Sequence, residues 1–263
     1  MGEVVRNLSA EGQRGRRAMP MAGATAGIRR SLYEIKTIAA KYPRLAIPIA
    51  RRRHGVPTGK DTEIVIEGFP RSGTSFAVAA FAMAQPRPVK VACHVHAPAQ
   101  VIAAVRAGIP ALVIVREPED TVLSFVVRNP HISVGQALRG YLRFYATLLP
   151  YRHGFVVGAF PDVVADFGAV VRGVNERFGT PFAEFEHTEE NVRECFEAID
   201  RDYRGRVRTP LELERIVARP SEVRDEMKAR LRGAYRSRGG FGLRARAERT
   251  YHSLMSMEGG NLR

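Results

Sequence analysis

The chain reads IVIEGFPRSGTS from Ile64 to Ser75, and this stretch decides the fold that we expect. A β-branched apolar run is followed by a loop with two glycines and then by an alanine-rich run from Phe76 to Ala84. This order predicts a buried strand, a phosphate-binding loop and a helix. A plain surface turn is the alternative, because the Gly-x-x-x-x-Gly spacing is common when it stands without such flanks.

The spacing from Gly68 to Gly73 matches the Walker A motif of nucleotide triphosphatases at every position but one. Thr74 stands where those enzymes carry lysine, and the cation lies inside the loop as Arg71. Free amides at a helix N-terminus still bind phosphate, but the lysine that bridges the β- and γ-phosphates is missing. The loop therefore predicts a phosphate-bearing ligand and argues against ordinary ATP hydrolysis.

The composition is that of one globular domain with appendages. The 263 residues are 45% hydrophobic, which is enough for one large core. No apolar run approaches the ~18 residues of a membrane span, and the N-terminus lacks the apolar segment of a secretory signal. Two cysteines, Cys93 and Cys195, cannot build a disulfide framework. We therefore expect a cytoplasmic protein.

Positive charge is concentrated at the N-terminus. Residues 1–60 contain 13 lysines and arginines and 3 acids, against 28 and 24 in the remaining 203 residues. Such a basic leader could contact an anionic membrane or a polyanionic acceptor, while a solvated, partly disordered extension is the alternative for residues 1–26. Aromatic residues are not interleaved with the basic ones, apart from Tyr33 and Tyr42, so we expect no nucleic-acid surface.

An amphipathic helix is predicted within the leader, at residues 27–41. Its apolar positions share one helical face, which would either lie on a membrane surface or pack against the domain. These positions are Ile28, Leu32, Ile35, Ile38 and Ala39. We divide the chain into this leader, 1–60, and one domain, 61–263.

Strands and helices alternate after residue 61. Strands are predicted at 63–67, 89–94, 111–115 and 155–160, and the last third is helical and highly charged. The pattern predicts a three-layer α/β/α architecture of the P-loop type, with a central parallel sheet, a helical N-terminal leader and a helical C-terminal third. Ligands of such folds bind at the carboxyl ends of the strands.

Polar side chains follow three neighbouring strands. The first strand leads into the phosphate loop, the second into His94 and His96, and the third into Arg116, with Ser124 on the next helix. In an extended chain the two histidines would point to the same side, as a general base with a neighbour or as a metal pair. A third metal ligand is not evident. Arg116 suits a second phosphate group, which a guanidinium binds through two hydrogen bonds.

Taken together, these residues resemble sulfotransferases that use 3′-phosphoadenosine 5′-phosphosulfate (PAPS). GFPRSGTS, ending at Ser75, resembles the family's 5′-phosphosulfate loop, and VREPED, which begins at Val115 and precedes Ser124, resembles its 3′-phosphate segment. The resemblance covers about residues 62–180. It implies a P-loop α/β fold, PAPS as cosubstrate, ADP-3′-phosphate as product, no metal requirement, and a hydroxyl-bearing acceptor.

The resemblance also implies roles for individual residues. Arg116 and Ser124 would bind the 3′-phosphate, and His96 would be the catalytic base, because Pro98 follows it at the family's spacing. Arg71 would stabilise charge on the leaving oxygen. The 5′-phosphosulfate would be bound by Arg71, Ser72, Gly73, Thr74 and Ser75.

The chain departs from the family pattern at three places. His94 occupies the position of a family lysine, so it stays a catalytic candidate of undefined role. The family's C-terminal glycine-rich loop has only a loose counterpart at 236–242, and the chain contains no tryptophan to stack on adenine.

The acceptor and two rival functions stay open at this point. The acceptor could be a glycan, a glycolipid or a small molecule, bound by residues 129–152 and the helical C-terminal third. Tyr141, Phe144, Tyr145 and Tyr151 could line a sugar or phenol pocket, although aromatic residues at helical spacing are more often core. The rivals are a P-loop kinase-like enzyme that uses ATP and a non-enzymatic basic module that binds lipid.

Overall fold

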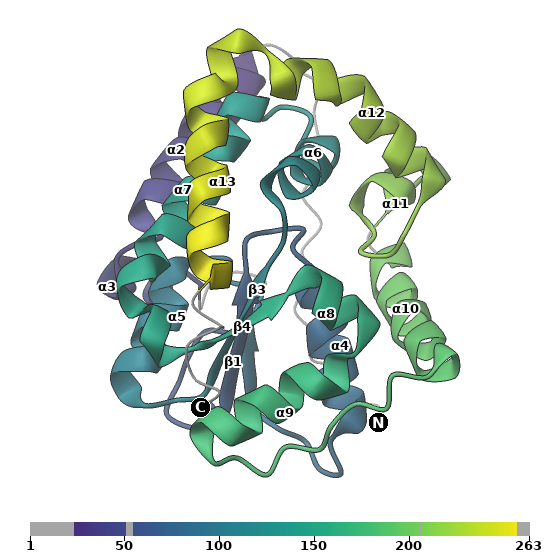
Figure 1. Cartoon of the computed structure of the whole chain (residues 1–263). Coiled ribbons are helices and arrows are strands. Elements are labelled where there is room, and N and C mark those ends of the chain that lie inside the picture. Colours follow the sequence, from purple (N-terminus) through teal and green to yellow (C-terminus); the bar gives the residue numbers. More distant parts are fainter. Residues whose placement is uncertain (1–23, 51–54, 206, 257–263) are drawn as a thin grey trace.

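The computed structural model describes residues 24–50, 55–205 and 207–256, which are built around a parallel sheet of four strands (Figure 1). The strand order is β2-β1-β3-β4. The strands are β1 (Ile64–Gly68), β2 (Val91–Cys93), β3 (Ala111–Val115) and β4 (Val156–Ala159). The expected α/β fold with a central parallel sheet is confirmed.

Both faces of the sheet are covered, as the unbroken apolar run of β3 predicts. Alternate residues point to opposite faces, so Val65 and Val113 pack into one hydrophobic cluster while Ile66 and Leu112 pack into the other. The register pairs Ile66 with Leu112, and Leu112 in turn with Val156. The sheet is therefore the middle layer of three.

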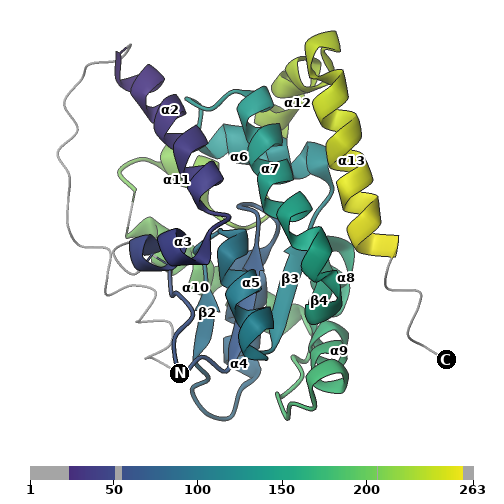
Figure 2. The ribbon, with the colours of Figure 1, turned by 90° about the vertical axis from the view of Figure 1, so that its left-hand side faces the viewer.

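Helices form the two outer layers (Figures 1 and 2). One face carries α5 (Pro98–Ala107), α7 (Val134–Leu148) and α13 (Phe241–Met255). The other face carries α4 (Thr74–Ala84), α8 (Phe160–Ala165), α9 (Phe167–Phe178) and α10 (Glu189–Arg204). Two short 3₁₀ helices lie at Leu149–Gly154 and Arg238–Gly240.

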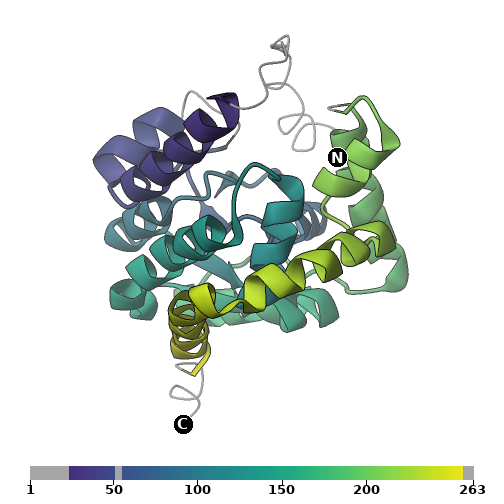
Figure 3. The ribbon, with the colours of Figure 1, turned by 90° about the horizontal axis from the view of Figure 1, so that it is seen from above.

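Three further helices lie beyond the carboxyl edge of the sheet (Figure 1). Seen from above, α12 crosses the top of the molecule beside α6 (Figure 3). These helices are α6 (Pro118–Arg128), α11 (Pro210–Ile216) and α12 (Glu222–Arg236). Through α11 and α12 the helical C-terminal third reaches the carboxyl edge of the sheet, where a ligand is expected.

The N-terminal helices α2 (Ala24–Ala39) and α3 (Pro43–Ala50) pack on α7 and α5. Figure 2 shows α2 along the outside of α7. The amphipathic helix that the sequence predicts is therefore present. The prediction for residues 1–26 falls largely outside the described residues, since the description begins at residue 24. Within the described ranges, no helix is both long and apolar enough to cross a membrane.

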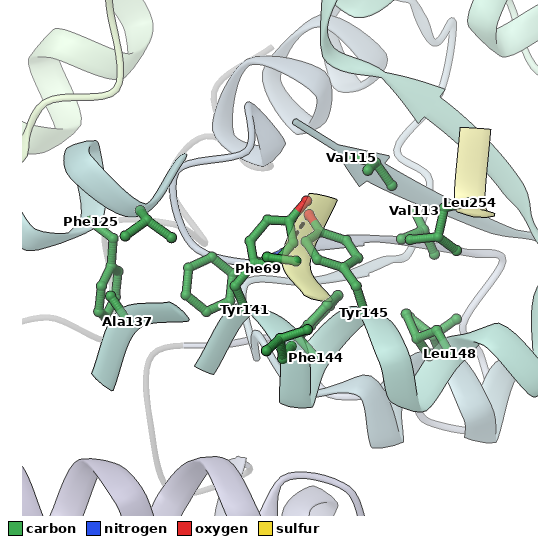
Figure 4. Close-up of a cluster of buried hydrophobic side chains, with 14 of the residues drawn as sticks. Phe69, Val113, Val115, Phe125, Ala137, Tyr141, Phe144, Tyr145, Leu148 and Leu254 are labelled. Atoms are coloured by element: carbon green, nitrogen blue, oxygen red, sulfur yellow. Dashed lines mark hydrogen bonds between the residues drawn. The ribbon is translucent and has the colours of Figure 1, made fainter. Parts of the chain in front are cut away.

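Two tyrosines of α7 connect the core to the strand ends (Figure 4). The Tyr145 hydroxyl donates to the Ile114 carbonyl at 2.7 Å and accepts from the Phe69 amide at 3.2 Å. The Tyr141 hydroxyl donates to the Arg116 carbonyl at 2.9 Å. Both rings are fully buried, so the suggestion that they line an acceptor pocket is wrong. Their position fixes the loops after β1 and β3 to the same helix.

Three local expectations differ from the structure. β2 ends at Cys93 rather than at residue 94, because His94 has a φ of 59° and leaves the extended conformation. The short helices α8 and α11 were not expected. For α11 a signal exists, since the Thr209 side chain caps the Glu212 amide at 3.1 Å and Pro210 follows at the first helical position.

We predict that Gly68→Ala destabilises the protein, because a Cβ there would lie 2.3 Å from Ser72 Oγ and 2.7 Å from the Ile114 carbonyl oxygen. Overpacking of this kind costs about 1–3 kcal/mol in the free energy of unfolding, measurable by urea denaturation. Gly173→Ala is the control, because its Cβ would meet nothing within 4 Å, and it should stabilise α9 by roughly 0.5–1 kcal/mol. Equal stability of the two variants would show that the loop does not approach β3 this closely.

Candidate anion-binding site at the carboxyl edge of the sheet

The strand order reverses between the carboxyl ends of β1 and β3, where open α/β sheets have a crevice, and we call this edge of the sheet the crevice. The chain passes from β1 to β2 on one side and then returns to β3 on the other side of β1. Such a switch point is where open α/β sheets bind their ligands. The glycine loop follows β1 and Arg116 follows β3, so the topology places both at this crevice.

The loop from Gly68 to Gly73 is shaped by two left-handed residues and by the hydrogen bonds of Ser72. Arg71 and Gly73 have left-handed φ values of 77° and 104°. The Ser72 amide and hydroxyl both donate to the Phe69 carbonyl, at 3.1 and 2.7 Å. Gly73 provides no side-chain cap, so no capping side chain occupies the first backbone amides of α4. These amides lie at the N-terminus of the helix, which is the end that favours an anion.

The hydroxyls of the loop point into the protein. Ser72 Oγ and Thr74 Oγ1 lie 3.4 Å apart, and both side chains are buried. The Ser75 hydroxyl interacts with Tyr203 of α10. These groups therefore hold the loop in shape, and the part of the loop that can reach a ligand is its backbone.

Arg71 turns its guanidinium away from the loop, toward α6 and α11. Its Nε donates to Ser124 Oγ at 3.0 Å. Its two terminal nitrogens donate to the carbonyls of Ile216 and Val217, each at 2.9 Å. The structure thus brings together Arg71 of the first motif and Ser124 of the second.

Two more arginines reach the same carbonyls. Arg128 donates to the Ile216 carbonyl at 3.2 Å, and Arg224 donates to the Val217 carbonyl at 2.6 Å. Arg224 is only 6% exposed. Burial lowers the pKa of Arg71, and the positive charges of Arg224 and Arg128 lower it further. Closely spaced, desolvated cations would be stabilised by an anion, so this cluster is a candidate anion site.

Arg116 lies against the other side of the loop. One terminal nitrogen donates to the Arg71 carbonyl at 3.3 Å, and the other forms an ion pair with Asp120. Asp120 also accepts from Lys228 of α12 at 2.7 Å. The Arg116 guanidinium carbon lies 3.8 Å from the centre of the Phe160 ring. These contacts fix the guanidinium beside the loop, where a second phosphate group could bind it.

His96 has one ring nitrogen committed to the loop. Nδ1 lies 2.8 Å from the Gly68 carbonyl oxygen. A carbonyl can only accept, so Nδ1 carries the proton and Nε2 keeps its lone pair. Burial lowers the pKa of His96 to about 3, and the positive charges of His94, Lys36 and Arg128 act in the same direction. The side chain is 26% exposed, so a neutral imidazole reaches the surface of the crevice.

His94 lies beside His96, with ring centres 5.8 Å apart. The expected geometry of an extended strand is wrong, because the two residues have φ values of 59° and 52°. Their proximity comes from the left-handed loop instead. Among the residues that the structure describes, no group of three or more histidines, cysteines and carboxylates could hold a metal ion.

Glu67, which sequence reasoning missed, connects the loop after β2 to the loop after β1. Its buried carboxylate accepts from the amides of Val95 and His96, at 2.7 and 3.2 Å, and from Gln100 Nε2 at 3.0 Å. Burial raises its pKa to about 8, although these hydrogen bonds oppose the shift. A lone acid inside the apolar run of β1 was the available signal.

Arg128 and Arg224 were also missed. Arg128 lies one helical turn after Ser124 on α6, so the spacing of four residues was a signal. Arg224 comes from a helix about a hundred residues away in sequence, and no local pattern indicates its position.

Two surface depressions of about 640 and 410 Å³ lie elsewhere, along α10 and at the start of α12. Neither is lined by Arg71, His96 or Arg116. The end of α11 covers the arginine cluster in this structure.

No protein-family model and no curated protein matches the chain. Among solved structures, the chain is similar to mouse sulfotransferase SULT7A1 complexed with PAP, at 13% identity and a TM-score of 0.38. The match covers 73% of this chain and 90% of that chain. A likeness of this size assigns no function, which must come from the site itself.

We predict that Glu67→Gln changes how stability depends on pH. The folded protein keeps a proton on Glu67 up to a pKa of about 8, whereas the unfolded chain loses it near pH ~4.3. The wild type therefore loses stability relative to the variant as the pH rises from 5 to 8. Urea denaturation of both proteins across this range measures the difference.

Glu63→Gln is the control for this experiment. The pKa of Glu63 is lowered by its hydrogen bond to Arg87, so the corresponding difference should stay flat above pH 5. If the Glu67→Gln difference is also flat, the Glu67 carboxylate is charged throughout and the burial argument is wrong.

Proposed function

We propose that this protein transfers the sulfuryl group of PAPS to a hydroxyl group of an acceptor. One observation carries the proposal: a glycine loop without the Walker lysine lies at one edge of the sheet with a cluster of partly or fully buried guanidiniums and a neutral imidazole. The guanidiniums suit a donor with two separate phosphate groups, and the imidazole suits proton abstraction.

The donor's phosphates would bind at opposite sides of Arg71. The 5′-phosphosulfate would accept from the backbone amides at the start of α4, and the 3′-phosphate would lie near Arg116 and Ser124. Arg71 would exchange the carbonyls of Ile216 and Val217 for phosphate oxygens. Hydrogen bonds to a charged acceptor are about twice as strong as those to a neutral one, which favours this exchange.

The transfer step would use His96 as general base. The acceptor oxygen forms a bond to sulfur while the bond from sulfur to the 5′-phosphate oxygen breaks, and the hydroxyl proton moves to Nε2 of His96. The Gly68 carbonyl stabilises the imidazolium through Nδ1–H. The donor's negative charge offsets the neighbouring cations, which raises the pKa of His96 when the donor is bound. Loop amides and Arg71 stabilise the charge on the leaving phosphate.

The site gives less support to an ATP-using kinase. Thr74 replaces the lysine that bridges the β- and γ-phosphates, and Arg116 follows β3 directly, where a Walker B carboxylate would bind Mg²⁺. Asp120, one turn further on, is ion-paired with Arg116 and with Lys228, which neutralises its charge. The acceptor is proposed only as a hydroxyl compound, such as a glycan, a glycolipid or a small molecule.

We predict that His96→Ala lowers transfer from radiolabelled PAPS by about 100-fold or more, because positioned general bases contribute 10²–10⁴-fold. Transfer would be screened over sugars, lipids and phenols. Affinity for ADP-3′-phosphate should change little, since in this proposal His96 takes the acceptor's proton and does not bind the donor's phosphates. His252→Ala, at an exposed histidine of α13, is the matched control. Parallel loss of binding and transfer in His96→Ala would contradict the role as a base.

A further inference from the structure

Helix α2 carries an apolar stripe that faces solvent. Ile28, Leu32, Ile35 and Ile38 are 60%, 58%, 62% and 48% exposed. Their spacing of four, three and three residues places them along one side of the helix. Figures 2 and 3 show α2 at the periphery of the molecule. An amphipathic helix that packs on a domain normally buries this side, so the exposure needs a reason.

The opposite side of α2 fixes this orientation. Glu34 forms ion pairs with Arg139 and Arg143 of α7, and Thr37 Oγ1 accepts from Arg143 at 2.7 Å. The Tyr33 hydroxyl fits against Gly140, where a Cβ would lie 2.0 Å from it. At 100° per residue, Tyr33 and Thr37 lie about half a turn from the apolar stripe. The helix is therefore held by the side that carries Tyr33, Glu34 and Thr37, and these contacts leave the apolar stripe facing outward.

Positive charge frames the stripe. Residues 24–50 contain five basic residues and a single acid, Glu34, which is already paired with α7. The sequence adds four arginines and two glutamates in residues 1–23 and three arginines at 51–53. Arg29 and Arg30 lie at the start of the stripe and are exposed. Apolar residues flanked by arginine and lysine are the composition of helices that lie in the headgroup region of anionic membranes.

A second copy of the chain fits this surface less well. Two such helices facing each other would bring their cations together without an exposed acid to pair with them, since Glu34 lies on the packed side. Anionic lipid supplies the missing negative charge and an apolar phase at the same time.

We propose that α2 docks the protein onto an anionic membrane surface, with Ile28, Leu32 and Ile35 inserted among the lipids and the α7 side holding the domain above them. The helix lies in the interface and does not span the bilayer, because its other side is occupied by α7. This inference does not depend on the proposed sulfuryl transfer.

The absence of tryptophan from the sequence makes a direct test possible. Leu32→Trp introduces a single fluorescent reporter into the stripe, and Leu211→Trp does the same at another exposed leucine, on α11. Both are titrated with phosphatidylcholine vesicles that contain about one third phosphatidylserine, and with vesicles of phosphatidylcholine alone. We expect a blue shift of emission for Leu32→Trp with the anionic vesicles only, and no shift for Leu211→Trp.

Vesicle co-sedimentation of the otherwise native chain gives the second readout. Leu32→Gln with Ile35→Gln should weaken binding to the anionic vesicles about tenfold or more, because two side chains that would be inserted lose their apolar surface. Leu211→Gln with Val223→Gln, at exposed sites on α11 and α12, should bind like wild type. Unchanged binding by the α2 variant would overturn the proposal. A Leu32→Trp emission that is already blue-shifted without lipid would overturn it too. A shift at all protein concentrations would mean that the chain itself covers the stripe. A shift only at high protein concentration would mean that a second copy covers it.

Discussion

The arrangement at the carboxyl edge depends on the guanidinium of Arg71. It connects the loop after β1 to Ser124 of α6 and to the last carbonyls of α11, and no other side chain in the described residues joins these three elements. Arg128 and Arg224 converge on the same carbonyls, so the fold gathers like charges that repel one another. The carbonyl dipoles at the end of α11 compensate part of that repulsion. An anion would compensate more of this repulsion than the carbonyl dipoles do, and this gain is the physical basis of the proposed site.

Backbone strain gathers at the same edge. Arg71, His94 and His96 all have left-handed φ values, which are uncommon for residues other than glycine, although histidine adopts them more often than most. Such residues cost of order 1–3 kcal/mol each and persist where the surroundings fix them. Here the fixing groups are Glu67, which accepts from two consecutive amides of the loop after β2, and the tyrosines of α7, which form hydrogen bonds with the backbone of the other two loops. The conformation of these loops is thus fixed by hydrogen bonds with buried residues of β1 and α7 rather than by contacts within the loops alone.

Short sequence patterns predicted the local elements but not the contacts between residues that are far apart in the chain. The alternation of strands and helices, the loop after Ile66 and the position of Arg116 follow from short patterns, and the structure contains all three. The direction of the Arg71 side chain could not be predicted, because the carbonyls that it binds, those of Ile216 and Val217, lie about ninety residues beyond the second motif. The apolar side of α2 was read correctly from its periodicity. Whether that side packs or stays exposed is decided by Glu34 and its two partners on α7, which periodicity does not reveal.

The central claim is that this crevice binds an adenosine nucleotide with phosphates at both the 5′ and 3′ positions. Calorimetric titration of the wild-type protein with ADP-3′-phosphate, ADP and ATP–Mg²⁺ tests it directly. We predict that ADP-3′-phosphate binds about ten- to a hundredfold more tightly than ADP, since the added phosphate gains one or more charge-assisted hydrogen bonds of roughly 1.5–3 kcal/mol each. Equal affinity for ADP and ADP-3′-phosphate, or tighter binding of ATP–Mg²⁺, would contradict the account.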